Sequence, residues 1–173
     1  MTTQQFDPNK AQNAVEIEKQ FAVVAVEHAQ TYWNLLASVP PRELKLTKFD
    51  DDIFTHLSEK FPELVEEPYT KLIKLDEEGL KSAEGKEKWR EFSTAYDGKV
   101  DKFNFGSLIR TNAEDEYSQY NSIFVIRIQF YAIEIARNRL GLNDKIHEKE
   151  KKELAEKKAK EEREKAKGKR KKD

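Results

Sequence analysis

The sequence predicts an all-α protein that folds as a single compact domain. Charged residues make up 38% of the chain, against about a quarter in an ordinary globular protein, and Gly and Pro are scarce, with 6 and 5 of 173 residues. Apolar residues also recur at helical spacing, and a chain of this length forms one core. We expect a flexible N-terminus over residues 1–10, a helical domain over residues 11–147 and a charged tail over residues 148–173.

The first helix is predicted from Ala11 to about Ser38. Asp7 and Pro8 are typical of an N-cap and a first helical turn, and Pro40 with Pro41 ends the helix, because proline disfavours helical geometry in the residue before it. One apolar stripe runs along this helix and consists of Phe21, Val24, Ala25, His28, Tyr32, Leu35, Leu36 and Val39. The stripe predicts that one face of the helix packs on the core.

Two further helices are predicted in the middle of the chain. Residues 44–48 alternate between apolar and polar and favour a short extended segment, after which Asp50 to Asp52 open a helix that continues to Phe61. Aspartates suit this place because they accept hydrogen bonds from free N–H groups and face the positive end of the helix dipole. The connection that follows is poorly periodic, and the next helix runs from Ser82 to Gly98.

A long central helix is predicted from Asn121 or Ser122 to Leu140, with Gly141 as its C-terminal stop. It is apolar on more than one face, which places it in the interior. Its first half, a β-branched run through Ile128, would also suit a buried strand. The preceding segment, residues 99–112, is predicted to be irregular or a short helix, with Gly106 marking a bend or a close backbone approach.

The tail has a different composition from the body. Residues 148–173 hold 13 basic and 8 acidic residues, a net charge of +5, whereas residues 1–147 hold 19 basic and 25 acidic residues, a net charge of −6. Glu and Lys at i,i+4 spacing, such as Glu148 with Lys152, predict a solvated, fraying helix that ends in disorder over residues 167–172. Such a tail can dock weakly on RNA phosphates, but it lacks the aromatic residues that specific recognition needs.

The sequence lacks the motifs of common catalytic and cofactor sites. It has no Cys and neither of the glycine-rich phosphate-binding motifs, and its three histidines lie on separate segments. His28 is expected to be a hydrogen-bonded core residue, His56 and His147 are expected at the surface, and Asp50 to Asp52 are expected to cap a helix rather than hold a cation. We therefore predict no cofactor, no metal and no enzyme. With no signal peptide or membrane span, we expect a monomer in the cytoplasm or nucleus.

Polar side chains in the predicted central helix are the most informative feature. Buried charges must be paired, because an unpaired one costs several kcal/mol. One interpretation is an internal network around Glu134 that includes Arg137 and Asn138 and extends to Arg127 and Arg110; the other is a groove that faces a partner.

The chain resembles the polysaccharide biosynthesis domain-containing protein 1 family of eukaryotes over residues 13–145, and its short start resembles fungal members. The motifs that carry the resemblance are Leu44–Lys48 with Asp51 and Ile53, Lys88–Arg90 with Phe92, Asp101–Gly106 with Leu108 and Arg110, Arg127–Phe130, and Ala132–Arg139 with Gly141. The resemblance implies an all-helical domain without demonstrated sugar chemistry. It also implies a dedicated chaperone of newly made translation elongation factor 1-alpha, which acts on the GTP-binding domain at the ribosome with the nascent polypeptide-associated complex.

On this basis one set of residues is expected either to bind the client or to specify the fold: Lys48, Trp89, Arg90, Asn104, Gly106, Arg110, Arg127, Gln129, Glu134, Arg137 and Asn138. Trp89 would anchor the client if it is exposed, and would be part of the core if it is not. Two other functions stay open: a ribosome or RNA adaptor that acts through the tail, and an enzyme of polysaccharide metabolism that uses Asp50 to Asp52 and His56.

Overall fold

The computed structural model describes the backbone of residues 8–171 and the side chains from residue 19 onward. Its regular elements are α1 (Pro8–Ser38), η1 (Pro41–Glu43), α2 (Asp50–Lys60), η2 (Pro62–Leu64), α3 (Thr70–Ile73), α4 (Glu77–Lys81), α5 (Ala83–Thr94), β1 (Gly106–Arg110), β2 (Ser122–Ile126), α6 (Arg127–Arg139) and α7 (Asp144–Arg170). The protein is mainly helical, but its two antiparallel strands mean that the predicted all-α class is only approximately correct.

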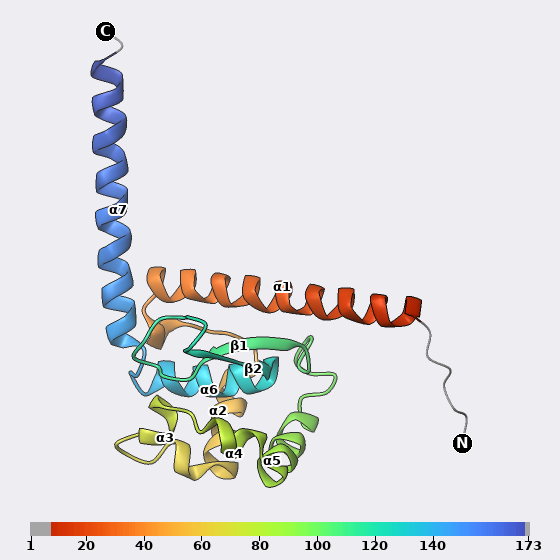
Figure 1. Cartoon of the computed structure of the whole chain (residues 1–173). Coiled ribbons are helices and arrows are strands. Elements are labelled where there is room, and N and C mark those ends of the chain that lie inside the picture. Colours follow the sequence, from red (N-terminus) through yellow and green to blue (C-terminus); the bar gives the residue numbers. More distant parts are fainter. Residues whose placement is uncertain (1–7, 172–173) are drawn as a thin grey trace.

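The elements are arranged in layers around α6. Helix α1 lies along the hairpin of β1 and β2, α6 lies beneath the hairpin, and α2 to α5 form the far side of the body (Figure 1). Helix α6 contacts both strands and also α2, α3 and α5, so it is the centre of the domain as predicted. All of its side chains from Ala132 to Asn138 are buried.

Helix α1 begins at Pro8, so residues 8–10 are helical rather than part of a flexible N-terminus. The predicted cap Asp7 and the rest of residues 1–7 lie outside the described part of the chain. The buried residues of α1 are Ala25, Ala29, Tyr32, Leu36 and Ala37, at helical spacing. The predicted stripe is correct only in part, because its members Phe21, Val24 and Leu35 are exposed.

The hairpin is the main departure from the predicted elements. Strand β2 replaces the first part of the predicted central helix, and β1 occupies part of the segment predicted to be irregular; Leu108 pairs with Phe124 and Arg110 pairs with Ser122. Residues 123–126 are all β-branched or aromatic, which favours a pleated surface. The prediction of helix was wrong here, and the strand that it left open is correct for residues 122–126.

Helix α6 begins where its first N–H groups find partners outside the helix. The N–H groups of Arg127 and Ile128 donate to the carbonyl oxygens of Phe105 and Phe103, at 2.7 and 2.9 Å. The Gln129 side chain accepts from the N–H of Ile126 at 3.0 Å. These bonds satisfy donors that a helix start leaves free. At the other end Gly141 has φ of 77°, a left-handed conformation that ends the helix as predicted.

Helix α7 leaves the body almost at once. Ile146 and His147 are buried, and the His147 ring donates to the carbonyl of Leu36 at 2.6 Å, so the expectation of a surface His147 was wrong. From Lys151 to Lys171 every side chain is exposed, and the helix projects away from the domain (Figure 1). The tail is helical as predicted, but the helix continues through residues 167–170, which the sequence had indicated as disordered.

Candidate functional site

Four of the predicted residues meet in one buried polar cluster on α6. Glu134 lies at its centre: its carboxylate contacts Arg137 at 2.8 Å and Arg110, on β1, at 3.6 Å. It also accepts from the Tyr32 hydroxyl at 2.5 Å. The side chains of Glu134, Arg110 and Arg137 are fully inaccessible to solvent. The cluster therefore joins α1, β1 and α6 through charges that no ligand can reach.

The amide groups of Asn138 and Asn143 complete the cluster. Asn143 Nδ2 donates to Glu134 at 3.0 Å and to Asn138 Oδ1 at 2.7 Å, while Asn143 Oδ1 accepts from Arg110 at 2.7 Å. Arg137 also donates to the carbonyl oxygens of Leu72 and Arg110, at 2.9 and 2.8 Å. Because Asn143 precedes α7 directly, these bonds fix the point from which α7 leaves the body.

The electrostatics of the cluster keep Glu134 ionised. Burial alone would raise the pKa of this carboxyl, but the charges of Arg110 and Arg137 and the hydrogen bond from Tyr32 outweigh burial and hold its pKa below the ordinary value. Burial and the neighbouring Glu134 charge raise the pKa of the Tyr32 hydroxyl well above 10.0, so Tyr32 stays a donor. The cluster is an internal network, as one of the two interpretations of these polar residues expected, and it does not line a groove.

Arg127, the fifth residue considered for the cluster, does not belong to it. It is the first residue of α6, at the opposite end of the helix from Arg137, and it is only partly buried. Its charge acts on His28 instead, where it adds to the effect of burial in lowering the pKa of the ring.

A second group of predicted residues lines a pocket of about 330 Å³ between α5, β2 and α6. Trp89, Arg90, Asn104 and Gln129 all contribute to its wall. Trp89 is 4% exposed and stacks on Phe61 with ring centroids 4.3 Å apart, so it is a core residue and the anchor proposed for an exposed Trp89 is wrong. Arg90 and Asn104 are exposed at the rim, and Gln129 is engaged by the N–H of Ile126.

Lys48 and Gly106 lie away from both groups. Lys48 lines a surface pocket with Asp50, Asp51 and Arg139, at the start of α2. Gly106 is the first residue of β1, and a Cβ built there would have no atom within 4 Å, so the predicted close backbone approach is wrong. Neither residue is shown to bind anything.

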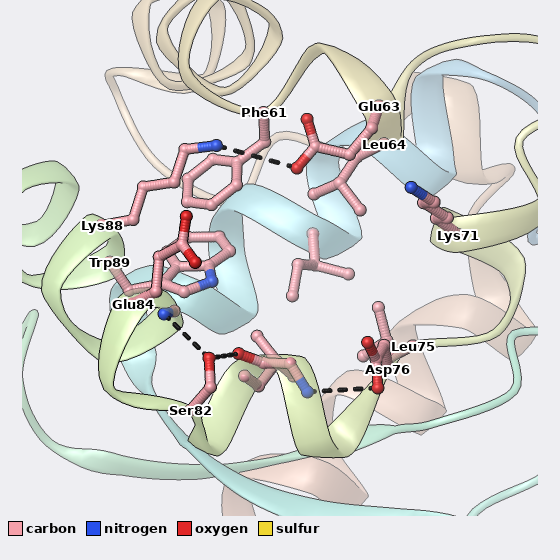
Figure 2. A pocket seen from close by; sticks show the side chains of 14 residues that line it. Phe61, Glu63, Leu64, Lys71, Leu75, Asp76, Ser82, Glu84, Lys88 and Trp89 are labelled. Atoms are coloured by element: carbon pink, nitrogen blue, oxygen red, sulfur yellow. Dashed lines mark hydrogen bonds and ion pairs between the residues drawn. The ribbon is translucent and has the colours of Figure 1, made fainter.

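Figure 2 shows another pocket, of about 340 Å³, between η2, α3, α4 and α5. Its floor is apolar and includes Leu75, Leu80 and Ile133, and its rim carries an ion pair of Lys88 and Glu63 at 3.8 Å. Helices α4 and α5 meet beside it so closely that a Cβ on Gly85 would lie 1.9 Å from the carbonyl oxygen of Gly79. The pocket offers a space for an apolar side chain beneath a charged rim.

Most of the residues considered for catalysis have separate structural partners. His28 Nδ1 lies 2.8 Å from Ser107 Oγ, and His56 stacks on Phe92 and lies 2.9 Å from the Tyr96 hydroxyl. Asp50 accepts from the N–H groups of residues 46 and 47, each at 2.7 Å, so it closes the loop before α2. The expectation that Asp50 to Asp52 cap the helix was wrong, because the N-cap residue is Phe49 and no side chain makes a capping hydrogen bond. No group of three potential metal ligands occurs among the described residues. His56 is partly buried rather than fully at the surface.

Exposed apolar side chains gather on the N-terminal half of α1, where the sequence analysis did not place a site. Val23 and Val26 are each 56% exposed, and Phe21 and Val24 are also exposed. The reason is visible in the sequence: residues 21–26 (FAVVAV) are all apolar, so the helix is apolar around its whole circumference, yet only one side packs on the body. This unbroken run, rather than the stripe alone, was the signal for a contact surface.

The hairpin extends this apolar surface. The Phe21 ring meets Phe105 edge-on with centroids 6.1 Å apart. Val26 and Leu108 line a common groove of about 320 Å³. Phe124, which is 64% exposed, pairs with Leu108 across the hairpin, and paired residues project from the same face of a sheet. We call residues 21, 23, 24, 26, 105, 108 and 124 the apolar surface.

The fold and the site together define a small, mainly helical protein with a closed polar interior and an exposed apolar surface. No helix in residues 8–171 combines the length and the apolar composition that a membrane span requires. The sequence profile of the PBDC1 protein family matches residues 17–148, and the chain belongs to this family. The resemblance read from the sequence is therefore confirmed.

Relatives and one solved structure support the same assignment. The protein PBDC1 homologues of Saccharomyces cerevisiae and Schizosaccharomyces pombe are 54% and 52% identical, and the alignments cover 82% and 84% of this chain and 95% and 98% of those proteins. Protein PBDC1 of Homo sapiens is 44% identical over 78% of this chain and 55% of its own length. A solution NMR structure of protein yst0336 from Saccharomyces cerevisiae matches with a TM-score of 0.71 and 50% identity, over 85% of this chain and 96% of that chain.

Proposed function

We propose that this protein is a dedicated chaperone of newly synthesised translation elongation factor 1-alpha. It binds the GTP-binding domain of the client while the nascent chain leaves the ribosome, and it protects that domain from misfolding and aggregation. The single observation that carries the binding role is the apolar surface on α1 and the hairpin. The identity of the client rests on the family resemblance.

The apolar surface suits the task of holding a partly folded protein. A nascent domain exposes apolar side chains that its own core will later cover, and these side chains bind best to another apolar surface. Covering a half-exposed valine such as Val23 or Val26 contributes about 1 kcal/mol, and a phenylalanine such as Phe124 contributes more. A handful of such contacts gives an affinity that is useful yet reversible, because association itself has an entropic cost.

The buried cluster makes this surface rigid. Tyr32 on α1 is tied to Glu134, and His28 on α1 lies against Ser107 of β1, so α1 keeps its position on the hairpin. A client therefore meets a preformed surface and does not have to order α1, which lowers the cost of binding.

Catalysis is not part of the proposal. An enzyme of polysaccharide metabolism would need the aspartates at the start of α2 and His56 to face a common substrate, but Asp50, Asp51 and His56 are engaged in separate local contacts. The partners that go with the chaperone role are the ribosome and the nascent polypeptide-associated complex, and the role places a monomeric protein in the cytoplasm.

A pair of matched variants tests the proposal. V23S/V26S removes apolar surface while leaving helix propensity nearly unchanged, since Val and Ser rank alike in helices. K19S/Q20S changes two exposed polar residues one turn away on the same helix. We expect the valine variant to bind the isolated GTP-binding domain of elongation factor 1-alpha roughly thirtyfold more weakly, which corresponds to about 2 kcal/mol, and to lose suppression of its aggregation.

The control variant K19S/Q20S should bind like the wild type in fluorescence anisotropy and in a light-scattering assay of client aggregation. Equal affinities for all three proteins would remove the apolar surface from the proposal. Failure of the wild type itself to bind this client would remove the proposal altogether.

A further inference from the structure

Charged residues are distributed unevenly along α7. Residues 144–164 hold 8 basic and 8 acidic side chains and are neutral, whereas residues 165–172 hold 6 basic and no acidic side chains. The net positive charge of the tail is therefore concentrated at its distal end. We call residues 165–172 the basic tip; those of its side chains that the structure describes, up to Lys171, are exposed.

The neutral part of α7 holds the basic tip at a distance. Between Lys151 and Lys165 the helix advances about 20 Å at its ordinary rise, and no side chain in this stretch packs on the body. Charges separated by more than about 8 Å are largely screened at physiological salt. The body carries a net charge of −6, so a polyanion bound at the tip is well beyond the reach of this repulsion.

The tip has the chemistry of a segment that binds polyanions such as a phosphate backbone. Successive helical residues turn by about 100°, so Lys165, Lys167, Lys169, Arg170 and Lys171 project on all sides of the helix. Stable anchoring on an anionic membrane requires an apolar face or a lipid chain in addition to basic residues, and the only uncharged residues here are Ala166 and Gly168. Stacking on nucleic-acid bases would require aromatic residues, and the tip has none.

We propose that the basic tip of α7 binds the phosphate backbone of RNA without sequence preference, and that the neutral part of the helix is a spacer that keeps this RNA away from the acidic body. The choice of RNA among polyanions rests on the proposed function, which places the protein beside the ribosome. The tip lies outside residues 17–148, the range that matches the family profile, so this binding is a property of this chain rather than of the shared domain.

The test uses the full chain and a fluorescein-labelled RNA hairpin in fluorescence anisotropy, with potassium chloride varied. The tip variant K165Q/K167Q/K169Q/R170Q/K171Q removes five positive charges. The control K149Q/K151Q/K152Q/K157Q/K158Q removes the same number from the neutral part, so the two variants have equal net charge. We expect the tip variant to lose at least a hundredfold in affinity at low salt and the control to lose less than about threefold.

Salt dependence gives a second readout. Release of counterions by five or six phosphate contacts predicts that the logarithm of the affinity falls with the logarithm of the salt concentration with a slope of about −4, and that the slope approaches zero in the tip variant. Equal losses in both variants would overturn the proposal, because net charge rather than the tip would then control binding. Binding to anionic vesicles but not to RNA, or more than a tenfold preference between two unrelated RNA sequences, would also overturn it.

Deletion of residues 153–163 tests the spacer. This segment contains four basic and four acidic side chains and spans about three helical turns, so its loss shortens α7 without changing net charge. We expect weaker RNA binding at low salt and a difference that disappears at high salt, and an unchanged affinity would refute the spacer. Client binding measured on the same variants should not change, so failure here and failure of the chaperone proposal are distinguishable.

Discussion

Replacing Glu134 with glutamine probes the buried cluster with almost no change of shape. In the native protein its carboxylate is the one negative charge between Arg110 and Arg137, at 3.6 and 2.8 Å, and all three side chains are inaccessible to solvent. Glutamine keeps the volume and can still accept from the Tyr32 hydroxyl. The variant E134Q therefore isolates the charge, leaving two guanidinium groups buried without a counterion.

The expected cost is large. Removing one partner of a buried ion pair destabilises a protein by about 3–5 kcal/mol, against a total stability of about 5–15 kcal/mol for an ordinary domain. The matched control is R139Q, which breaks the ion pair of Arg139 and Asp51 at 2.6 Å, in which the Asp51 side chain is 92% exposed. An exposed pair of this kind contributes less than about 1 kcal/mol.

Urea unfolding followed by circular dichroism measures both variants, and pH gives an independent check. Because the pKa of Glu134 is lower in the folded protein than its ordinary value of 4.5, its contribution is present above that pH and is lost as the pH falls through the folded-state pKa. E134Q should therefore be less sensitive to acid than the wild type. A loss of stability no larger in E134Q than in R139Q would refute the reasoning.

Three other predictions follow from the placement of single elements. Trp89→Ala should destabilise the fold by about 3–5 kcal/mol, because it leaves a cavity in the core beside Phe61. The thermal midpoint measured by circular dichroism should fall, and a wild-type midpoint combined with loss of client binding would contradict the core position. Partial burial and the charge of Arg127 lower the pKa of His28 from 6.5 to about 4, so the unfolded state binds a proton more readily than the folded state. The free energy of unfolding should therefore fall as the pH drops from 6.5 to about 4, by about 1 kcal/mol after allowance for solvent screening. His28→Asn should remove this part of the pH dependence in denaturant titrations, and an unchanged profile would count against it. Deletion of residues 151–173 should reduce the helical circular dichroism signal but change the free energy of unfolding by less than about 0.5 kcal/mol, since no described side chain from residue 151 onward packs on the body; a larger loss would mean that the tail supports the fold.

Helices with a clear stripe or a clear stop could be read from the sequence, and elements set by distant partners could not. The starts of α2 and of α5 at its Ser82 cap and the end of α6 at Gly141 depend on local signals, and their positions are close to those predicted, whereas α5 ends at Thr94 and not at Gly98. The start of α6 depends on the carbonyl oxygens of Phe103 and Phe105, which only the folded hairpin places within reach. Local propensity alone left strand and helix open over residues 122–126.

The buried cluster shows the same division. Charges on an otherwise apolar helix predicted a network around Glu134, and the structure contains one with Arg110, Arg137 and Asn138. Tyr32 and Asn143 could not be assigned, because their role depends on how α1 and the start of α7 approach α6. The apolar surface was not predicted, because the stripe on α1 indicated only the side of the helix that packs on the core. The apolar run of residues 21–26 covers the other sides of the helix as well.

Site-specific photo-crosslinking during translation tests the central claim that the apolar surface of α1 receives the client. A photoreactive residue is placed at Val23, or at Arg90 as a control on α5, which is exposed but lies outside this surface. We expect crosslinks from position 23 to nascent elongation factor 1-alpha once its GTP-binding domain has emerged, and few or none from position 90. Crosslinks of equal strength from both positions, or a broad mixture of nascent chains at position 23, would contradict the claim.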